Sequence, residues 1–193
     1  MGIISRFPAG ATEPYIKEIY NSDGEFIDVK MYGYETIRDY AFYNCINLAL
    51  TTLPSGITNI GSNAFSGCSN LALTSLPSGI TYIGNTAFSG CSSLALTSLP
   101  SGITTISDFA FENCASLALT TLPSGIISIG NYAFSGCSNL VSLTFEGTPE
   151  NIGASAFADC NNLTTINVPW AEGAVANAPW GATNATINYG YTG

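Results

Sequence analysis

Large apolar residues recur along the chain with a fixed period of 23 positions. In each period an alanine and a phenylalanine lie four and three positions before a cysteine, and a leucine follows the cysteine three positions later. The cysteines of the six copies are Cys45, Cys68, Cys91, Cys114, Cys137 and Cys160. Because six copies follow one another without insertion or deletion, the pattern predicts a repeat solenoid with one rung per copy.

One period is too small to fold alone. Its roughly six large apolar side chains contribute about 1.5–3 kcal/mol each when buried. Ordering its 23 residues costs about 35 kcal/mol at roughly 1.5 kcal/mol per residue. Stacked copies share burial and backbone hydrogen bonds at a spacing of about 4.8 Å. The sequence therefore predicts six stacked rungs over residues 34–169.

Within a rung, the segment Leu-Ala-Leu-Thr-Thr-Leu-Pro at 48–54 is predicted as the strand, closed by a proline that has no amide hydrogen to donate. The Asn-Ala-Phe-Ser-Gly-Cys stretch is too short for a full helix and is predicted as a turn or a short 3₁₀ segment. A recurrent glycine, first seen at Gly61, predicts a corner where a Cβ does not fit.

A row of leucines raises a question about the inner face. Leu48 and Leu50 share a side of the strand, whereas Leu53 has the opposite parity. Either the strand bends so that all three point inward, or one row forms an exposed apolar stripe. We expect burial, because an exposed stripe would promote aggregation or mark an interface. The row in question is Leu50, Leu73, Leu96 and Leu119.

The N-terminal residues precede the repeats and are predicted to cap them. Residues 15–33 read as a β-hairpin with its turn at Asp23-Gly24. Residues 1–14 contain two prolines and two glycines and are predicted to be a flexible tether.

Residues 170–193 are predicted to cap the other end, because a solenoid must cover its last apolar face. Trp170 and Trp180 flank a helix-like stretch at 172–177, and residues 185–189 read as one last strand.

Charge excludes two classes of partner. All four basic residues precede Asp39, and the seven acidic residues from Asp39 onward have no basic residue among them. Binding to nucleic acid or to an anionic membrane surface needs Lys or Arg, so neither is expected. Membrane insertion is not expected either, because no apolar run approaches the roughly 20 residues of a spanning helix.

The residue types also argue against catalysis and cofactors. The chain has no histidine and no Cys-x-x-Cys pair, so the usual general base and the usual zinc ligands are missing. One thiol per rung, with parallel Cβ vectors, suits a disulfide poorly. We therefore expect no metal, no cofactor and no enzymatic activity, and a buried ladder of free cysteines acting as small hydrophobes.

The combined frame of Ile-Gly, Ala-Phe, Cys, Leu and a strand closed by Leu-Pro or Val-Pro resembles the BspA-like leucine-rich repeats, the type also seen in treponemal surface proteins. The resemblance covers residues 34–169 and implies a leucine-rich-repeat right-handed coil with a parallel β-sheet on its concave face. It also implies adhesion at bacterial or protist surfaces. The chain departs from the family where Thr51 and its copies replace an apolar residue. Its ends, 5–8 and 178–186, resemble those of short phage and prophage repeat proteins.

From this resemblance we expect a non-catalytic binding or adhesion module of a bacterial cell surface or virion, recognising a protein or glycan on a host or neighbouring cell. The alternative is a structural spacer or a self-assembling subunit. The chain is expected to be a monomer or a weak homo-oligomer. Because the first residues do not read as a secretory signal peptide, a cytoplasmic location stays open.

Three aromatic residues stand at positions that vary between rungs. They are Tyr82, Phe109 and Tyr132. Each neighbours a position expected to be buried, so alternation turns it outward, and stacking places Phe109 and Tyr132 about 5 Å apart. We take the three as a candidate ligand-binding site. The alternative is that they only cover neighbouring side chains.

Overall fold

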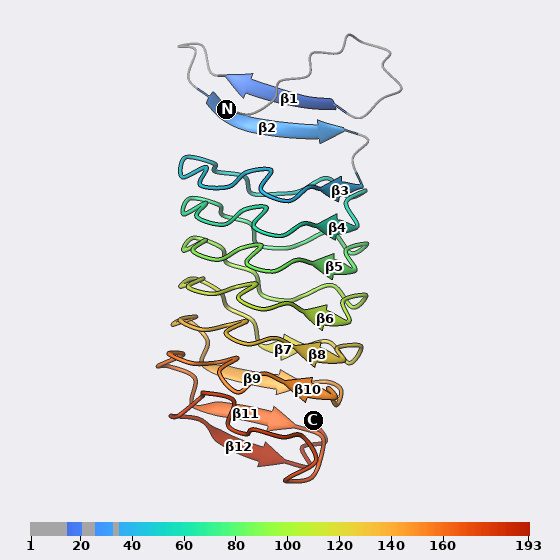
Figure 1. Cartoon of the computed structure of the whole chain (residues 1–193), viewed down its shortest axis with the longest axis vertical. Coiled ribbons are helices and arrows are strands. Elements are labelled where there is room, and N and C mark those ends of the chain that lie inside the picture. The colour runs from blue at the N-terminus through green and yellow to red at the C-terminus, as the bar shows by residue number, and fades with distance from the viewer. Residues whose placement is uncertain (1–14, 21–25, 33–34) are drawn as a thin grey trace.

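The chain coils into a stack of parallel rungs (Figure 1). The computed structural model describes residues 15–20, 26–32 and 35–193. Within these residues the regular elements are all strands, and no helix is present that is long and apolar enough to cross a membrane. The predicted repeat solenoid with parallel sheet and turns is confirmed.

The larger sheet has one two-residue strand from each of six rungs, all parallel and in chain order. Its strands are β3 (Thr36–Ile37), β4 (Asn59–Ile60), β5 (Tyr82–Ile83), β6 (Thr105–Ile106), β8 (Ser128–Ile129) and β10 (Asn151–Ile152). The strand predicted at 48–54 lies elsewhere in the rung, and this sheet was not predicted from the sequence. Its strands are too short to show alternation, so only the recurring isoleucine marks them.

Glycines next to these strands let successive rungs approach. The Gly61 amide donates to the Ile37 carbonyl at 2.8 Å, and a Cβ on Gly61 would lie 2.5 Å from the Asp39 amide nitrogen. Cβ atoms are essentially never found that close to another heavy atom, so the predicted glycine corner is confirmed. In the fourth rung Ser107 replaces glycine, and its hydroxyl donates to the Ile83 carbonyl at 2.6 Å.

The second sheet lies on the leucine segment and has four parallel strands in the order β12-β11-β9-β7. They are β7 (Thr121–Leu122), β9 (Ser142–Phe145), β11 (Thr165–Val168) and β12 (Thr186–Tyr189). The strand prediction at 48–54 and its next two copies is wrong, because this segment forms regular strands only from β7 onward.

Proline accounts for that difference. The Glu146 amide donates to the Leu122 carbonyl at 3.0 Å and helps to pair β9 with β7. One rung earlier the same position is Pro123, which has no amide hydrogen, so the equivalent bond cannot form. The first rungs keep a single inter-rung bond on this segment, such as the Ala72 amide to the Leu50 carbonyl at 3.0 Å.

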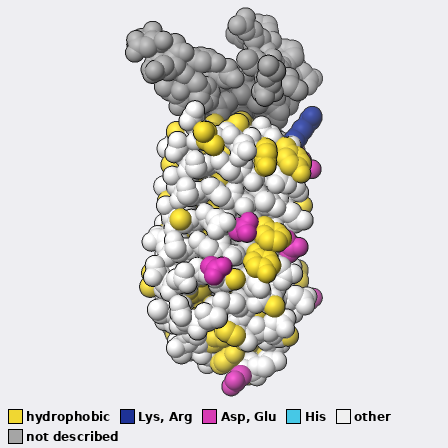
Figure 2. Space-filling model, turned by 60° about the vertical axis from the view of Figure 1, so that its left-hand side comes forward, with side chains coloured by type: hydrophobic (Ala, Val, Ile, Leu, Met, Phe, Trp, Pro, Cys, Tyr) yellow, Lys and Arg dark blue, Asp and Glu magenta, His cyan; other side chains and the backbone are white. Residues whose placement is uncertain are grey.

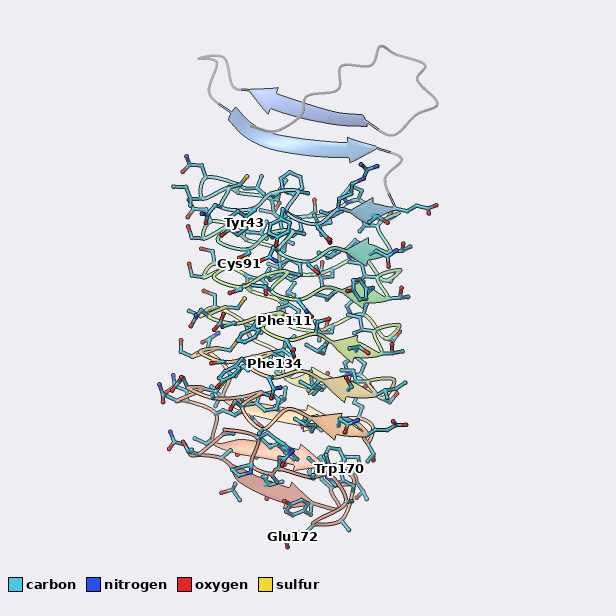
Figure 3. The ribbon with its side chains drawn as sticks, in the orientation of Figure 1. Tyr43, Cys91, Phe111, Phe134, Trp170 and Glu172 are labelled. Atoms are coloured by element: carbon cyan, nitrogen blue, oxygen red, sulfur yellow. The ribbon has the colours of Figure 1, made fainter. Side chains whose placement is uncertain are left out.

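The core runs along the whole stack. The leucine row is buried as expected: Leu50 is 2% exposed and Leu73 is 0% exposed, and Leu96 and Leu119 are also buried. Phenylalanines form a second column in which neighbouring rings stack with centroids 5.1–5.5 Å apart and planes within 6°. Figure 3 shows Phe111 and Phe134 one above the other in this column. Aligned rings therefore hold consecutive rungs in register.

The ends carry different elements. Strands β1 (Tyr15–Tyr20) and β2 (Phe26–Tyr32) pair antiparallel. The predicted turn at Asp23-Gly24 and the predicted tether at 1–14 lie outside the described residues. The capping role of this hairpin stays a prediction.

At the other end β12 pairs with β11, which confirms the expected last strand. Residues 172–177 form turns and bends, so the helix-like prediction is wrong. Gly173 and Asn177 have φ values of 82° and 67°, which an α-helix does not accommodate. The buried Trp180 ring completes this end. The backbone carbonyl of Trp180 accepts a hydrogen bond from the Phe157 amide at 2.9 Å.

Candidate functional site

Two of the three predicted aromatic residues lie together. The rings of Phe109 and Tyr132 stack on consecutive rungs with centroids 5.2 Å apart and planes within 6°. Phe109 is half-buried, and Tyr132 is 40% exposed. Their spacing matches the value that the repeat predicts. The pair thus forms one continuous aromatic surface across the fourth and fifth rungs.

Tyr82 belongs to a different column. It lies in β5, is 46% exposed, and pairs with Asn59 of β4. In its own rung the place equivalent to Phe109 is taken by Thr86. The structure therefore does not place Tyr82 in the aromatic stack, although its side chain is as accessible as predicted.

The stacked pair occupies a backbone conformation that large side chains rarely adopt. Phe109 and Tyr132 have φ values of 57° and 55°, in the left-handed region. The same column is left-handed at Tyr40, Asn63 and Thr86. Asparagine is the residue among these that tolerates this region best, while a bulky side chain costs on the order of 1–2 kcal/mol. The stacking contact, worth about 0.5–1.5 kcal/mol, offsets part of that cost.

Two carboxylates of the fourth rung, close to Phe109 in sequence, bond to the neighbouring rungs, one on each side. Asp108 accepts a hydrogen bond from the Asn131 amide at 2.8 Å, and Glu112 accepts one from the Ser89 hydroxyl at 3.0 Å. Figure 2 shows a face of the molecule on which hydrophobic side chains lie next to acidic ones near mid-height. Asp39 makes the same bond to Ser62 in the first rungs, so this position has a structural role whether or not a ligand binds.

Other exposed apolar side chains were not singled out from the sequence. Tyr40 and Tyr43 are 59% and 51% exposed and meet edge to face at 5.7 Å. Ile127 and Val141 are 48% and 57% exposed. Tyr40 lies in the same variable column as Phe109 and Tyr132, and Tyr43, Ile127 and Val141 each occupy a column that is small or polar in the other rungs.

The cysteine ladder is hydrogen-bonded as well as buried. Each buried thiol donates to the carbonyl of the phenylalanine 26 residues earlier, as Cys91 (labelled in Figure 3) does to Phe65 at 3.0 Å. Burial raises the pKa of Cys68 to about 12 and holds the pKa of Cys114 well above its ordinary value. Thiolate, the reactive form, is therefore scarce at neutral pH. Cys45 departs from the prediction because it is exposed.

No cluster of three or more His, Cys, Asp or Glu side chains that could hold a metal ion occurs among the residues that the structure describes. The groups available to a ligand on the described surface are aromatic rings, hydroxyl and amide groups, and carboxylate oxygens.

Comparison with known proteins gives one family. The model of the BspA type leucine-rich-repeat region matches residues 19–124 and 70–173, in six copies. The comparison with curated proteins found no match.

Solved structures show the same fold. The leucine-rich-repeat protein TpLRR of T. pallidum is 27% identical with a TM-score of 0.58, and the match covers 97% of this chain and 83% of that one. A leucine-rich-repeat protein from Bacteroides ovatus is 21% identical with a TM-score of 0.56, covering 83% of this chain and 47% of that one. The pneumococcal vaccine antigen PcpA is 18% identical with a TM-score of 0.53, covering 87% and 48%. The chain thus spans about half the length of the last two proteins.

Proposed function

The chain belongs to the BspA-type leucine-rich-repeat family, and from this premise we propose that it is a non-catalytic binding module whose ligand is a protein or a glycan. The observation that carries the proposal is the stacked pair of Phe109 and Tyr132 on the outside of the solenoid. These two residues are the core of the proposed site. Tyr82 is exposed but lies in another column and is not part of that core.

Two physical features of the pair support the proposal: the rigidity of the stacked array and the backbone strain at Phe109 and Tyr132. Aromatic rings held on a stacked array lose little conformational entropy on binding, and rings of this kind dominate many binding surfaces. The left-handed backbone of Phe109 and Tyr132 favours asparagine or glycine, yet two large rings stand there. Backbone strain of this kind clusters at functional sites. Packing of the solenoid alone does not require it, because Asn63 fills the same position in the second rung.

We further propose that the module acts outside the cell, on a bacterial surface or a virion. Family membership supports this, and one of the similar structures is described as a vaccine antigen. A surface of Ser, Thr, Asn and Gly, with 9% charged residues in the whole chain, suits contact with neutral partners.

A binding screen with a designed variant tests the site. The purified chain is applied to a glycan array and to a panel of immobilised extracellular-matrix proteins. The double variant Phe109→Asn/Tyr132→Asn removes both rings while its residues remain suited to φ near 55°. We expect unchanged or slightly higher thermal stability and at least a tenfold loss of affinity for any ligand that the native chain binds.

Tyr82→Thr is the matched control, since Thr105 holds that position in the next rung. It removes an exposed ring from the other column and should leave binding within about twofold. Native affinity in the double variant would refute the aromatic site. Failure of the native chain to bind any member of either panel would count against the binding function itself.

A further inference from the structure

Strand β12 ends the smaller sheet with one edge open. It pairs with β11 on one side and is the terminal strand of the order β12-β11-β9-β7, at the lower end of Figure 1. The Thr186 amide donates to the Thr164 carbonyl at 2.9 Å. Because amides of a strand point alternately to its two sides, those of Ile187 and Tyr189 face away from β11. Among the described residues no strand pairs with that edge.

This edge lacks the features that usually prevent pairing with another chain. Charged residues, proline and bulges protect edge strands, and β12 has the sequence Thr-Ile-Asn-Tyr with a regular register. Residues 173–193 contain no Asp, Glu, Lys or Arg. The strands at the other end of the chain differ, since β1 and β2 each contain a lysine and an acidic residue.

The side chains of β12 also leave contacts unused. Ile187 and Tyr189 are only half-buried although they pack against the core. The Asn188 side-chain amide donates to the Asn167 side-chain oxygen at 2.8 Å, and Asn167 donates to the Thr144 hydroxyl at 3.1 Å. A further strand beside β12 would cover the apolar side chains and continue this polar row.

We propose that β12 pairs antiparallel with β12 of a second copy of this chain, around a two-fold axis. A two-fold axis brings identical strands together in opposite directions and closes the assembly at two copies. The charge distribution favours this occupant: two chains of net charge −9 meet with least repulsion at an end without charged strand residues. Glu172 is the last charged residue of the sequence and lies at this end (Figure 3). The Phe109–Tyr132 pair lies on earlier rungs and stays accessible in such a dimer.

Sedimentation velocity and light scattering over a concentration series test the proposal. The full chain should change from one to two copies as its concentration rises. Thr186→Lys places a charge at the exposed start of the edge strand and should weaken the dimer at least tenfold.

Ser142→Lys is the control, because Ser142 lies in register with Thr165 and Thr186, two strands inward on the same sheet. It adds the same charge without touching the edge and should keep the native dimer. Circular dichroism checks folding, and Asn188→Lys replaces Thr186→Lys if the latter is unfolded. A native chain that stays monomeric at high micromolar concentration refutes the proposal. Equal weakening by both lysines, or growth beyond two copies, refutes it as well.

Discussion

At the scale of single residues, contact between rungs depends on which atom fills each corner. The Gly84 amide donates to the Ile60 carbonyl at 2.8 Å, whereas in the next rung the Ser107 hydroxyl takes the equivalent carbonyl of Ile83. A donor is thus kept in each rung while its chemical origin changes. The carbonyl remains satisfied, as a buried acceptor must be to avoid a desolvation penalty.

The corner glycines give a direct prediction for stability. A Cβ on Gly84 would lie 2.6 Å from the Ser62 amide nitrogen, so Gly84→Ala must push two backbones apart. We expect a loss of about 1–3 kcal/mol in the free energy of unfolding, the usual cost of overpacking. Chemical denaturation followed by circular dichroism measures it.

Gly79→Ala is the control for this prediction. A Cβ on Gly79 would lie 3.7 Å from the nearest atom, the Ile57 carbonyl oxygen, which is an ordinary contact. Stability should then stay within about 0.5 kcal/mol or rise slightly, because alanine reduces the freedom of the unfolded chain. If both variants lost stability equally, the close approach at Gly84 would not be the cause.

The sequence predicted much at this scale and missed one feature. Burial of Leu50 and the lack of room at Gly61 followed from the period alone, because identical positions meet the same surroundings in each rung. The left-handed backbone at Phe109 was missed. Asn63 in the same column is a residue suited to the left-handed conformation and was the one sequence feature that indicated it.

At the scale of elements, the phenylalanine column connects the rungs more evenly than the smaller sheet does. The rings of Phe111 and Phe134 are 5.5 Å apart and nearly parallel, and similar contacts repeat through the stack. The smaller sheet by contrast has regular strands only towards the C-terminal end. The early rungs therefore depend on the core and on the two-residue strands for their alignment.

Removing one ring from the column should be costly. Phe111 is fully buried, so Phe111→Ala leaves a cavity and deletes two stacking contacts. We expect the free energy of unfolding to fall by about 3–5 kcal/mol, measured from urea unfolding curves.

Phe109→Ala provides the comparison, two positions away with the same residue type. Its ring is half-buried on the outside and has one stacking partner, Tyr132. Its replacement should cost about 1 kcal/mol, close to the value of an aromatic pair. A loss as large as that for Phe111→Ala would mean that Phe109 serves packing rather than binding.

Element boundaries were harder to predict than the period. The leucine segment at 48–54 has the composition of a strand, but the proline column removes one amide donor per rung there. The helix-like stretch at 172–177 is interrupted by left-handed residues Gly173 and Asn177. Both errors come from backbone constraints that hydrophobic patterning does not register.

At the scale of the whole molecule, five buried thiols act together on stability. They remain protonated in the folded chain because burial raises their pKa values, to about 12 for Cys68 and about 11 for Cys160. In the unfolded chain they ionise near their ordinary value of 9.0. Below that pH their contribution is fully present; it is lost as the pH rises from about 9 towards the folded pKa values.

We therefore expect the melting temperature to be level between pH 6 and 8 and to fall above about pH 9. Each thiol contributes up to about 1.4 kcal/mol per pH unit in that range. A variant with serine at Cys91, Cys114 and Cys137 keeps a donor for each phenylalanine carbonyl and should lose less stability on going from pH 8 to 10. Identical pH profiles for the two proteins would contradict this account.

The sequence predicted the architecture of the whole molecule because the repeat leaves few alternatives for stacking. It predicted less about the site. Phe109 and Tyr132 lie on consecutive rungs as expected, but Tyr82 belongs to another column, which requires knowing where each column runs around the coil. The ligand does not follow from patterning, since repeating positions are fixed by packing and carry no information about a partner.

The constant spacing of contacts also bears on how the chain folds. Hydrogen bonds between rungs join residues a fixed short distance apart in sequence, 23 for Asp108 to Asn131 and 26 for Cys114 to Phe88. The entropy lost in closing a loop depends on its length, so each new rung pays nearly the same amount. Folding can begin at any pair of neighbouring rungs and spread in both directions, with the ends ordering last. The search for the native state is then a series of equal local steps, whose number grows only in proportion to the number of rungs.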